Sequence, residues 1–460
     1  MYARRGGRSS LGFWALLALA GSAGSFVACS TTPPADGSGG TTSGGQAGET
    51  TGGSSAGGAA AGGAAAGGSD PTGSGGFTTG SPNWSEDLAP LVYRECVGCH
   101  RTGGVAPFPL ETFEDAFAAG VALTVHTASR HMPPMPVDGS GSCNTFSNAR
   151  WLTDDEIALF AEWNDAGKPQ GDPSLAPDLP EPPPSLDEPD IVLDPGEEYS
   201  PNDALDDDYR CFVIDSGLTE DQYITAYEVN PGDARVVHHA IVYEPTSDSV
   251  AQDIADLDAA EAGPGYTCFG GVGVDAEPRV LWAPGGGYVQ MPQDTGVLLT
   301  AGRPLILQVH YNLKNGSFPD RTTVELSLAD EVAQPAIYQP IGDLDMVLEP
   351  GLEDATTTRE FSAFGISAVV HGVIPHMHTL GRELSVTTDA DGEDHCLVTV
   401  DRWDFHSQNA WWYAEPLRFD SVDSVSITCS YDTTDRTEQV RWGEGTQDEM
   451  CLTYLYMTTE

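Results

Sequence analysis

Most of the chain after residue 190 has the pattern of short β-strands. Apolar and polar positions alternate in segments such as "RVVHHAIVYEP", "PLILQVHYNL", "ISAVVHGVIPHMHTL" and "DSVSITCSYD", which are separated by Gly, Pro, Asp and Asn. No long amphipathic helix interrupts them. This pattern is typical of antiparallel β-sandwiches. About 270 residues are enough for two of them, which we place at residues 190–330 and 331–460.

The pattern before residue 173 is helical instead. The segment "SEDLAPLVYREC" predicts one helix. The segment "LTDDEIALFAEWNDAGKP" predicts another, because Thr153 and Glu156 form a capping box, and Gly167 and Pro169 would end the helix. We therefore predict a small all-α module at residues 83–172 that precedes the two β-domains, in a protein that is mainly β.

Two segments of biased composition flank this module. Residues 30–82 are almost entirely Gly, Ala, Ser and Thr, which cannot bury enough apolar surface to fold, so they predict a flexible tether. Residues 173–189 are rich in Pro and acidic residues, which predicts an extended and stiffer linker.

Residues 1–29 have the composition of an export signal. Arginines precede a short apolar run, small residues follow it, and the run is too short for a comfortable membrane span. The end of the segment, "FVAC", resembles the lipobox of bacterial lipoproteins, in which Cys29 would carry the lipid. We expect an exported protein in the bacterial periplasm, or at the outer membrane or cell surface, attached to the membrane only through this lipid anchor.

The charge of the chain excludes two classes of partner. Lys and Arg number 20 against 69 Asp and Glu, which gives a formal net charge of −49. Nucleic acids and anionic lipid surfaces are bound by clustered basic residues, so we expect neither as a partner. A solvated, repulsive surface is the simplest explanation of the acidity.

The segment "ECVGCHRTGG" has the spacing of a c-type haem attachment site. Cys96 and Cys99 can bond to haem, and His100 follows as an iron ligand. A chance match, or half of a zinc site, is the alternative interpretation, but no second CxxC accompanies the first. We therefore expect a covalently bound haem c in the module.

The opposite iron ligand should be Met or His, and "SRHMPPMPVD" offers His131, Met132 and Met135. The module resembles the small cytochrome c-like domains of bacterial multidomain proteins, in which an "MPP" segment carries the axial methionine. This resemblance implies Met132 as the ligand, and Met135 and His131 remain the alternatives.

Histidines gather in the predicted strands. His376 and His378, in "VIPHMHTLG", lie on one face of a regular strand, and two imidazoles side by side suggest a metal. In "LILQVHYNL", alternation puts His310 on the less apolar face, where it is free to be a ligand. His238 and His239 would point to opposite faces of a regular strand. Both can bind one metal only if the strand bends or ends there.

In order along the chain, "VVHHAIVY", "LQVHYNL", "HMHTLGREL" and "CSYDTTDRTEQVRWGEGTQDEMC" follow the motifs of a known family. They resemble the copper type II, ascorbate-dependent monooxygenases, which include peptidylglycine α-hydroxylating monooxygenase and dopamine β-monooxygenase. The resemblance covers residues 190–460 and implies two jelly-roll-like copper domains. It implies that an electron-transfer copper is bound by His238, His239 and His310, and that a catalytic copper is bound by His376, His378 and Met450. Tyr454 is a further catalytic residue that the resemblance implies.

The ligand types support copper independently of the family. A thioether such as that of Met450 is a soft ligand that suits Cu(I), whereas zinc and hard cations seldom bind one. The predicted function is therefore hydroxylation of a C–H bond of a small organic substrate with O2. Electrons would come from ascorbate or another reductant, with the attached haem as a route to the two coppers.

Two other functions compete with this prediction. The chain could be a copper and haem electron-transfer protein without hydroxylase activity, but electron relay alone would not need the catalytic ligand Met450. A structural or adhesive surface protein would not need all six ligands. Ile374 stands where peptide-amidating relatives place an Arg for the peptide carboxylate, and Leu452 stands where they have Asn. These two departures argue against glycine-extended peptides as substrates.

Six cysteines remain after the lipid and haem assignments: Cys143, Cys211, Cys268, Cys396, Cys429 and Cys451. An exported protein can oxidise them, in many alternative pairings. The family resemblance implies a Cys429–Cys451 bond, which would fix the segment that presents Met450. A bond between Cys211 and Cys268 is a guess.

Overall fold

The computed structural model of the chain describes residues 80–104, 106–134, 137–405 and 407–459, without the side chain of Phe364. The predicted signal segment, Cys29, nearly all of the tether and Met135 lie outside these residues. Within the described residues, no helix combines the length and the apolar composition needed to cross a bilayer.

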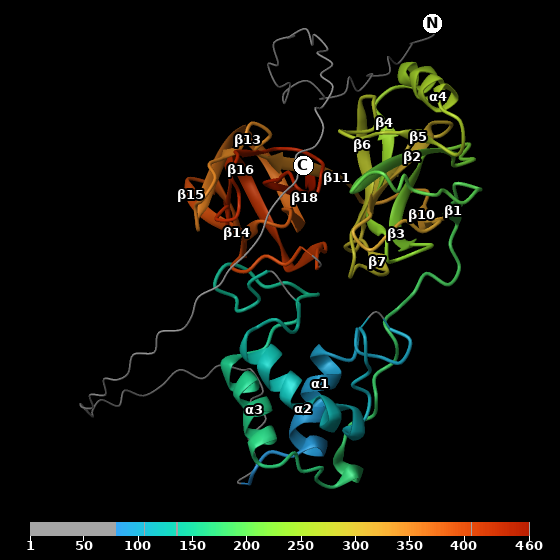
Figure 1. Cartoon of the computed structure of the whole chain (residues 1–460). Helices are drawn as coiled ribbons and strands as arrows, with labels where there is room; N and C mark the ends of the chain where they lie inside the picture. Colours follow the sequence, from blue (N-terminus) through green and yellow to red (C-terminus); the bar gives the residue numbers. More distant parts are fainter. Residues whose placement is uncertain (1–79, 105, 135–136, 406, 460) are drawn as a thin grey trace, which may run out of the picture. The chain divides into compact units, whose positions relative to one another are not determined.

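The module before the linker is helical, as its sequence pattern predicts. It contains the π-helical turn η1 (Trp84–Leu88), α1 (Ala89–Glu95), α2 (Phe113–Ala128), α3 (Asp154–Asp165) and the 3₁₀ turn η2 (Pro173–Leu175) (Figure 1). The predicted capping box of α3 is present, since the Glu156 N–H donates to Oγ1 of Thr153 at 3.2 Å. Gly167 follows the helix with a φ of 85°, which favours glycine. Phe160 and Trp163 are fully buried in the core of the module.

The rest of the described chain is built mainly from strands. Up to residue 330 the elements are β1 (Ile191–Leu193), β2 (Asp207–Asp215), β3 (Gln222–Asn230), β4 (Val237–Pro245), η3 (Asp248–Val250), α4 (Ala251–Ala260), β5 (Tyr266–Thr267), β6 (Ala276–Trp282), β7 (Val289–Gln290), β8 (Thr295–Leu299), β9 (Pro304–Asn312) and β10 (Thr323–Ala329). They are followed by β11 (Gln334–Gly342), β12 (Val347–Leu348), β13 (Ala355–His376), β14 (Gly381–Ala390), β15 (Glu393–Val400), β16 (Trp411–Tyr431), β17 (Val440–Arg441) and β18 (Leu452–Thr459).

The strands up to residue 330 form two antiparallel layers that share one core. One layer has the strand order β5-β2-β9-β4-β6, and the other contains β1, β10, β3 and β8. Phe212 and Val309 from the first layer belong to the same buried cluster as Val229 and Leu326 from the second. This arrangement agrees with the antiparallel sandwich that the alternating pattern predicts.

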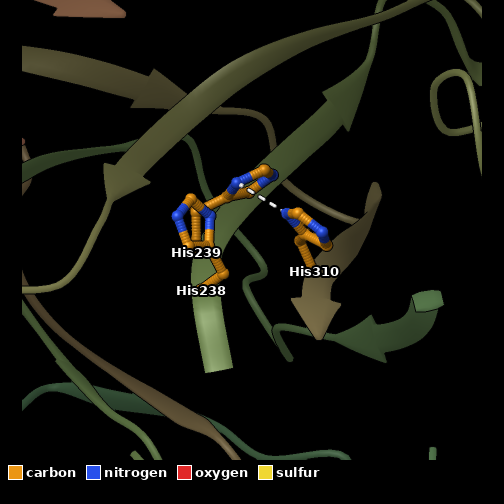
Figure 2. Close-up of side chains that lie close together, drawn as sticks. All are labelled: His238, His239 and His310. Atoms are coloured by element: carbon orange, nitrogen blue, oxygen red, sulfur yellow. Dashed lines mark hydrogen bonds between the residues drawn. The ribbon is translucent and has the colours of Figure 1, made fainter. Parts of the chain in front are cut away.

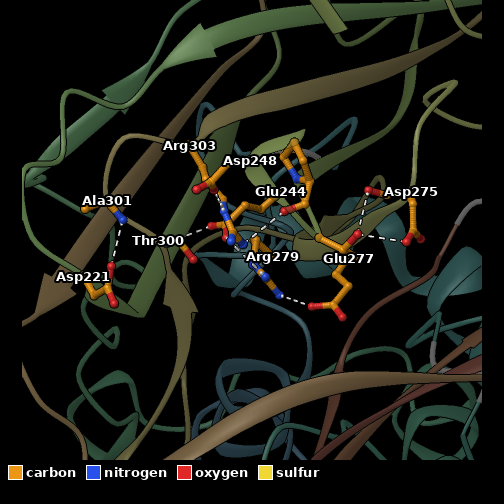
Figure 3. A network of polar contacts seen from close by, with 11 residues as sticks. Asp221, Glu244, Asp248, Asp275, Glu277, Arg279, Thr300, Ala301 and Arg303 are labelled. Atoms are coloured by element: carbon orange, nitrogen blue, oxygen red, sulfur yellow. Dashed lines mark hydrogen bonds and ion pairs between the residues drawn. The ribbon is translucent and has the colours of Figure 1, made fainter. Parts of the chain in front are cut away.

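A buried ion network fixes the end of β4 that follows its histidines (Figure 3). Glu244 is fully buried and accepts from the Thr300 N–H at 3.0 Å. The guanidinium groups of Arg279 and Arg303 each lie 3.5 Å from its carboxylate, and Arg303 also binds Asp248 at 2.8 Å. Because loss of one partner would leave a buried charge uncompensated, this network holds β4, β6 and the turn before β9 together.

The C-terminal strands continue the second of these layers. β11 pairs in parallel with β8 and antiparallel with β18, and the sheet then runs through β13, β16, β14 and β15. Tyr456 of β18 packs across this junction: it is fully buried in the core of the preceding sandwich, with its hydroxyl 2.9 Å from Oγ1 of Thr295. The described chain is thus mainly β with antiparallel sheets, as predicted, but it differs from two separate sandwiches. The parallel pair of β8 and β11 joins the C-terminal strands to a layer of the preceding sandwich in one continuous sheet.

One segment of the helical module packs on the C-terminal β-domain. This segment, residues 137–148, is called the arm below. Val137 forms a bridge to the end of β15, and Phe146 forms one to the start of β16. Both side chains are buried in the core of that domain, and a disulfide joins Cys143 to Cys396. The module is thus attached by a covalent bond that the sequence did not predict, as well as through the linker, whose residues are mostly exposed.

Two further disulfides are present. Cys211 of β2 is bonded to Cys268, which is the pairing offered as a guess, and the bond implied by the family resemblance joins Cys429 to Cys451. The first bond ties β2 to the residue that follows β5, and the second ties β16 to the residue that precedes β18. Among the described cysteines, the two of the CxxCH motif are free.

Candidate metal centres

Three of the histidines expected to bind metal meet between β4 and β9. His238 and His239 lie on β4, and His310 lies opposite them on β9 (Figure 2). The pairing register shifts between Val237 and His239, which makes His238 the extra residue of a β-bulge. This bulge is the bend that the sequence requires, because it allows two adjacent histidines to approach one partner.

The ring nitrogens of these histidines converge (Figure 2). One nitrogen from each ring lies within 4.8 Å of the others, and Nδ1 of His239 lies 3.3 Å from Nδ1 of His310. Two nitrogens bound to one ion at about 2.0–2.1 Å, the distance usual for histidine on zinc, would have nearly this separation. Oδ1 of Asp207 accepts from Nε2 of His310 at 2.9 Å, so Nδ1 of His310 keeps its lone pair.

The surroundings keep the three imidazoles neutral. Burial lowers the pKa of each ring below its ordinary value, and the neighbouring histidines lower the pKa of His238 and His239 further. Both ring nitrogens of His238 are buried without a hydrogen-bond partner, which is costly for a polar group. Burial opposes ionisation of Asp207, but hydrogen bonds from His310 and Thr446 lower its pKa to about 2. Neutral imidazoles with orphaned nitrogens beside a carboxylate fit a metal ion.

The second group stands where β13 ends. His376 is the last residue of β13, and its ring centroid lies 5.2 Å from that of His378. Nδ1 of His376 lies 2.6 Å from Oε1 of Gln408, and Nδ1 of His378 lies 3.0 Å from the carbonyl oxygen of Asp448. Because both oxygens are acceptors, each Nδ1 carries the proton and each Nε2 keeps a lone pair for a metal. Burial lowers the pKa to about 4 for His376 and to about 3 for His378.

Met450 is buried, and both of its neighbours in the sequence are bonded to other parts of the chain. It is 5% exposed, and Cys451 on one side is bonded to Cys429. On the other side, the carboxylate of Glu449 accepts from the N–H of His378 at 2.9 Å. The disulfide ties the segment of the methionine to β16, and Glu449 ties it to the segment of the two histidines.

One cavity of about 160 Å³ touches both groups. His239 of the first group and His376 and Met450 of the second group line it, together with Tyr454 of β18. The rings of His239 and His376 are 6.3 Å apart. The other three histidines are not among its wall residues and are at most 8% exposed. Residues from both groups of predicted ligands therefore line one cavity.

The wall of this cavity is mostly apolar and aromatic. Ile374, Leu452, Trp282 and Trp442 contribute to it. Glu444 supplies one carboxylate, and no Lys or Arg is found among the described residues of the wall. An apolar cavity of about 150 Å³ can hold one benzene molecule. The space therefore suits a small molecule that carries no negative charge.

Four residues that shape these groups were missed by sequence reasoning. Asp207 and Gln408 orient histidines, and Phe405 stacks on His238 with ring centroids 4.4 Å apart. No motif marks these three residues. Glu449 had a signal, since it stands next to the proposed methionine ligand in "DEMC".

The candidate haem residues lie at the end of α1. Cys96 and Cys99 are free thiols, and His100 is 9% exposed. Nδ1 of His100 lies 2.9 Å from the carbonyl oxygen of Phe108, so Nε2 keeps a lone pair for iron. Two free thiols and an oriented imidazole are the donor groups that the haem prediction requires. Met132 lies on the wall of a larger cavity, of about 570 Å³.

The chain is similar to known proteins. Residues 351–459 match the family model described as copper type II ascorbate-dependent monooxygenase, C-terminal domain. DBH-like monooxygenase protein 1 of Gallus gallus is 25% identical over 271 residues, which are 51% of this chain and 42% of that protein. Dopamine beta-hydroxylase of Rattus norvegicus is 23% identical over 270 residues, 54% of this chain and 43% of that protein. The chain thus spans less than half the length of these relatives. The family match supports a C-terminal domain of the copper type II ascorbate-dependent monooxygenase type over residues 351–459.

Similarity to solved structures is weak. The major capsid protein P2 from bacteriophage PM2 is 10% identical with a TM-score of 0.26, over 58% of this chain and 97% of that chain. A score this low carries no argument about fold or function.

Proposed function

We propose that the chain is a copper monooxygenase that hydroxylates a C–H bond of a small organic molecule with O2. The observation that carries this proposal is the cavity at which two groups of neutral imidazoles and a thioether meet. When bound, two copper ions would supply one-electron redox chemistry and O2 activation. One ion would be held by three histidines and the other by two histidines and a methionine: His238, His239 and His310; His376, His378 and Met450.

The residues around the ligands orient them and exclude water. Asp207, Gln408 and the carbonyl of Asp448 each accept a hydrogen bond from one ring nitrogen of a histidine. The proton of each ring therefore stays on that nitrogen, and the lone pair of the other ring nitrogen remains available to a metal. The apolar wall limits the access of water to reactive species. Burial raises the pKa of Tyr454 to about 12, so its hydroxyl remains protonated on the wall as a hydrogen-bond donor.

The substrate is proposed to be small and neutral or cationic. Glu444 is the charged side chain of the wall, and burial raises its pKa because a carboxylate there loses solvation. A carboxylate on the substrate would meet this group without a Lys or Arg to balance it among the described wall residues. An amine or hydroxyl of the substrate could donate to Glu444 instead.

The helical module is proposed to bind haem c through Cys96, Cys99 and His100, with Met132 as the second iron ligand. Its electrons would come from ascorbate or another reductant. Export to the periplasm or cell surface, with a lipid on Cys29, is part of the proposal. The three disulfides support it, because such bonds persist in oxidising compartments.

Oxygen consumption coupled to product formation tests the proposed function. The mature, copper-loaded chain, supplied with a reductant, should consume O2 in the presence of a small amine or aromatic substrate and place one labelled oxygen atom from ¹⁸O2 in the product. Copper-free protein is the control. If a copper-loaded and reducible protein hydroxylates nothing in a broad panel of such molecules, the electron-transfer alternative is favoured.

Replacing Asp207 by asparagine should weaken copper binding at the first histidine group by about 10–100-fold, as is usual for a hydrogen-bond partner of a metal ligand. The amide can no longer act as a charged acceptor for Nε2 of His310. The measurement is copper titration against a competing chelator. The matched control is Asp206→Asn, because Asp206 is the exposed neighbour of Asp207. Equal copper affinity in the two variants would contradict this role for Asp207.

A further inference from the structure

The loop between β15 and β16, residues 401–410 without 406, contacts the helical module on one side. It is called the bridge loop below. The guanidinium of Arg402 donates to the carbonyl oxygen of Ser129, and the hydroxyl of Ser407 donates to the carbonyl oxygen of Pro134. These two carbonyls stand on either side of the proposed methionine ligand of the haem in the sequence. The bridge loop therefore reaches the segment that would cover the iron.

The same loop contacts both histidine groups. The ring of Phe405 stacks on that of His238, with centroids 4.4 Å apart and planes 20° apart. Oε1 of Gln408 accepts from Nδ1 of His376 at 2.6 Å. Nε1 of Trp403 donates to the carbonyl oxygen of the second histidine of that pair at 3.0 Å. Residues adjacent in the chain thus contact the module and the candidate copper ligands.

The arm holds both ends of the bridge loop in place. The Cys143–Cys396 disulfide lies before the loop, at β15. At the other end, the side-chain amide of Asn148 donates to the carbonyl oxygen of Ala410 at 2.7 Å and accepts from the N–H of Trp412 at 3.0 Å. The module is therefore attached to the chain at both ends of the loop.

The cavity of about 570 Å³ beside Met132 has basic residues on its wall, which suit the negatively charged edge of a cofactor. Three of the 20 basic residues of the chain, Arg130, Arg150 and Arg402, line it, together with two aspartates. Arg150 also lies against the predicted haem-attachment motif, which contains Gly98. If Gly98 carried a Cβ atom, that atom would lie 2.2 Å from a guanidinium nitrogen of Arg150. Haem carries two carboxylates on one edge, and guanidinium groups bind carboxylates through paired hydrogen bonds.

We propose that the bridge loop is the route by which electrons pass from a haem in the module to the copper ions, with Arg402 at the haem carboxylates and Phe405 and Gln408 at the histidines. This inference rests on the proposed function, because it requires both the haem and the coppers. In each transfer one electron leaves iron(II), which becomes iron(III), and reduces copper(II) to copper(I), and no bond forms or breaks. An external one-electron donor such as ascorbate then reduces the iron again.

Re-oxidation of the haem tests the route without turnover. In the full chain loaded with haem and Cu(II), and without substrate or O2, the haem is reduced by a light flash with a photoreductant and its absorbance is followed. We expect first-order re-oxidation at a rate that does not depend on protein concentration, and none in copper-free protein. A rate that rises in proportion to protein concentration would show transfer between molecules and would overturn the inference.

Two variants locate the route. Phe405→Leu should slow the re-oxidation with copper content unchanged, whereas Phe361→Leu on β13 should not. Arg402→Gln should lower the midpoint potential of the haem, because a positive charge that favours the reduced state is removed. Arg359→Gln, which removes an equally charged side chain from β13, should leave that potential unchanged.

The outcomes separate this inference from the proposed function. A chain that binds neither copper nor haem contradicts both. A chain that binds both and hydroxylates substrate with a chemical reductant, but does not re-oxidise its haem in the dark, contradicts the inference alone. Wild-type behaviour of Phe405→Leu and Arg402→Gln in both measurements would also overturn it.

Discussion

Replacement of Met450 by leucine should lower substrate-dependent O2 consumption by at least about 100-fold, since loss of a ligand should cost more than the roughly 10–100-fold that loss of a ligand's hydrogen-bond partner costs. Leucine fills a similar volume without a ligand atom, so the chain should fold. A thioether favours Cu(I), the state that the proposed O2 chemistry requires. The measurement is O2 uptake at saturating substrate and reductant.

The matched control is Met457→Leu, because Met457 is equally buried at 5% exposure but lies in the core of the C-terminal β-domain. It should keep near-normal activity. Both variants should keep the haem spectrum. Turnover by Met450→Leu at the unmodified rate would show that the assignment of His376, His378 and Met450 to a catalytic copper is wrong.

A double variant, Cys96→Ser with Cys99→Ser, should carry no covalently bound haem. Serine is close to cysteine in size but forms no thioether, and both thiols are free in the structure. The measurement is haem staining after denaturing electrophoresis of protein made in a host that matures c-type cytochromes. Each single variant should keep one attachment and a weaker stain.

Copper content separates a local effect from misfolding in the double variant, since the histidine groups lie in the β-domains and should still bind copper. A full haem stain in the double variant would exclude haem attachment at this motif. Loss of copper together with haem would show that the module is needed for the fold of the β-domains.

The sequence could predict those features of the fold and of the candidate site that depend on one strand or helix. The capping box of α3 follows from two residues one turn apart, and it is present. The conflict between His238 and His239 in a regular strand predicts a bend, and the structure has a β-bulge there. The motif resemblance implied the Cys429–Cys451 bond, which is also present.

Contacts between distant segments could not be predicted in this way. Cys143 and Cys396 are separated by 253 residues, and nothing near either one indicates its partner. Gln408 and Phe405 acquire their contacts with histidines only because the loop that carries them folds back over the end of β13. Such contacts depend on how whole segments pack, which local patterns of apolar residues do not encode.

The central claim is most directly tested by counting metals in the purified mature chain, made with sufficient copper and analysed by elemental mass spectrometry. The account predicts two copper atoms per chain, and one in a His310→Ala variant, in which only the all-histidine group should lose its ion. Zinc in both sites after copper-replete expression, or two coppers retained in the His310→Ala variant, would contradict it.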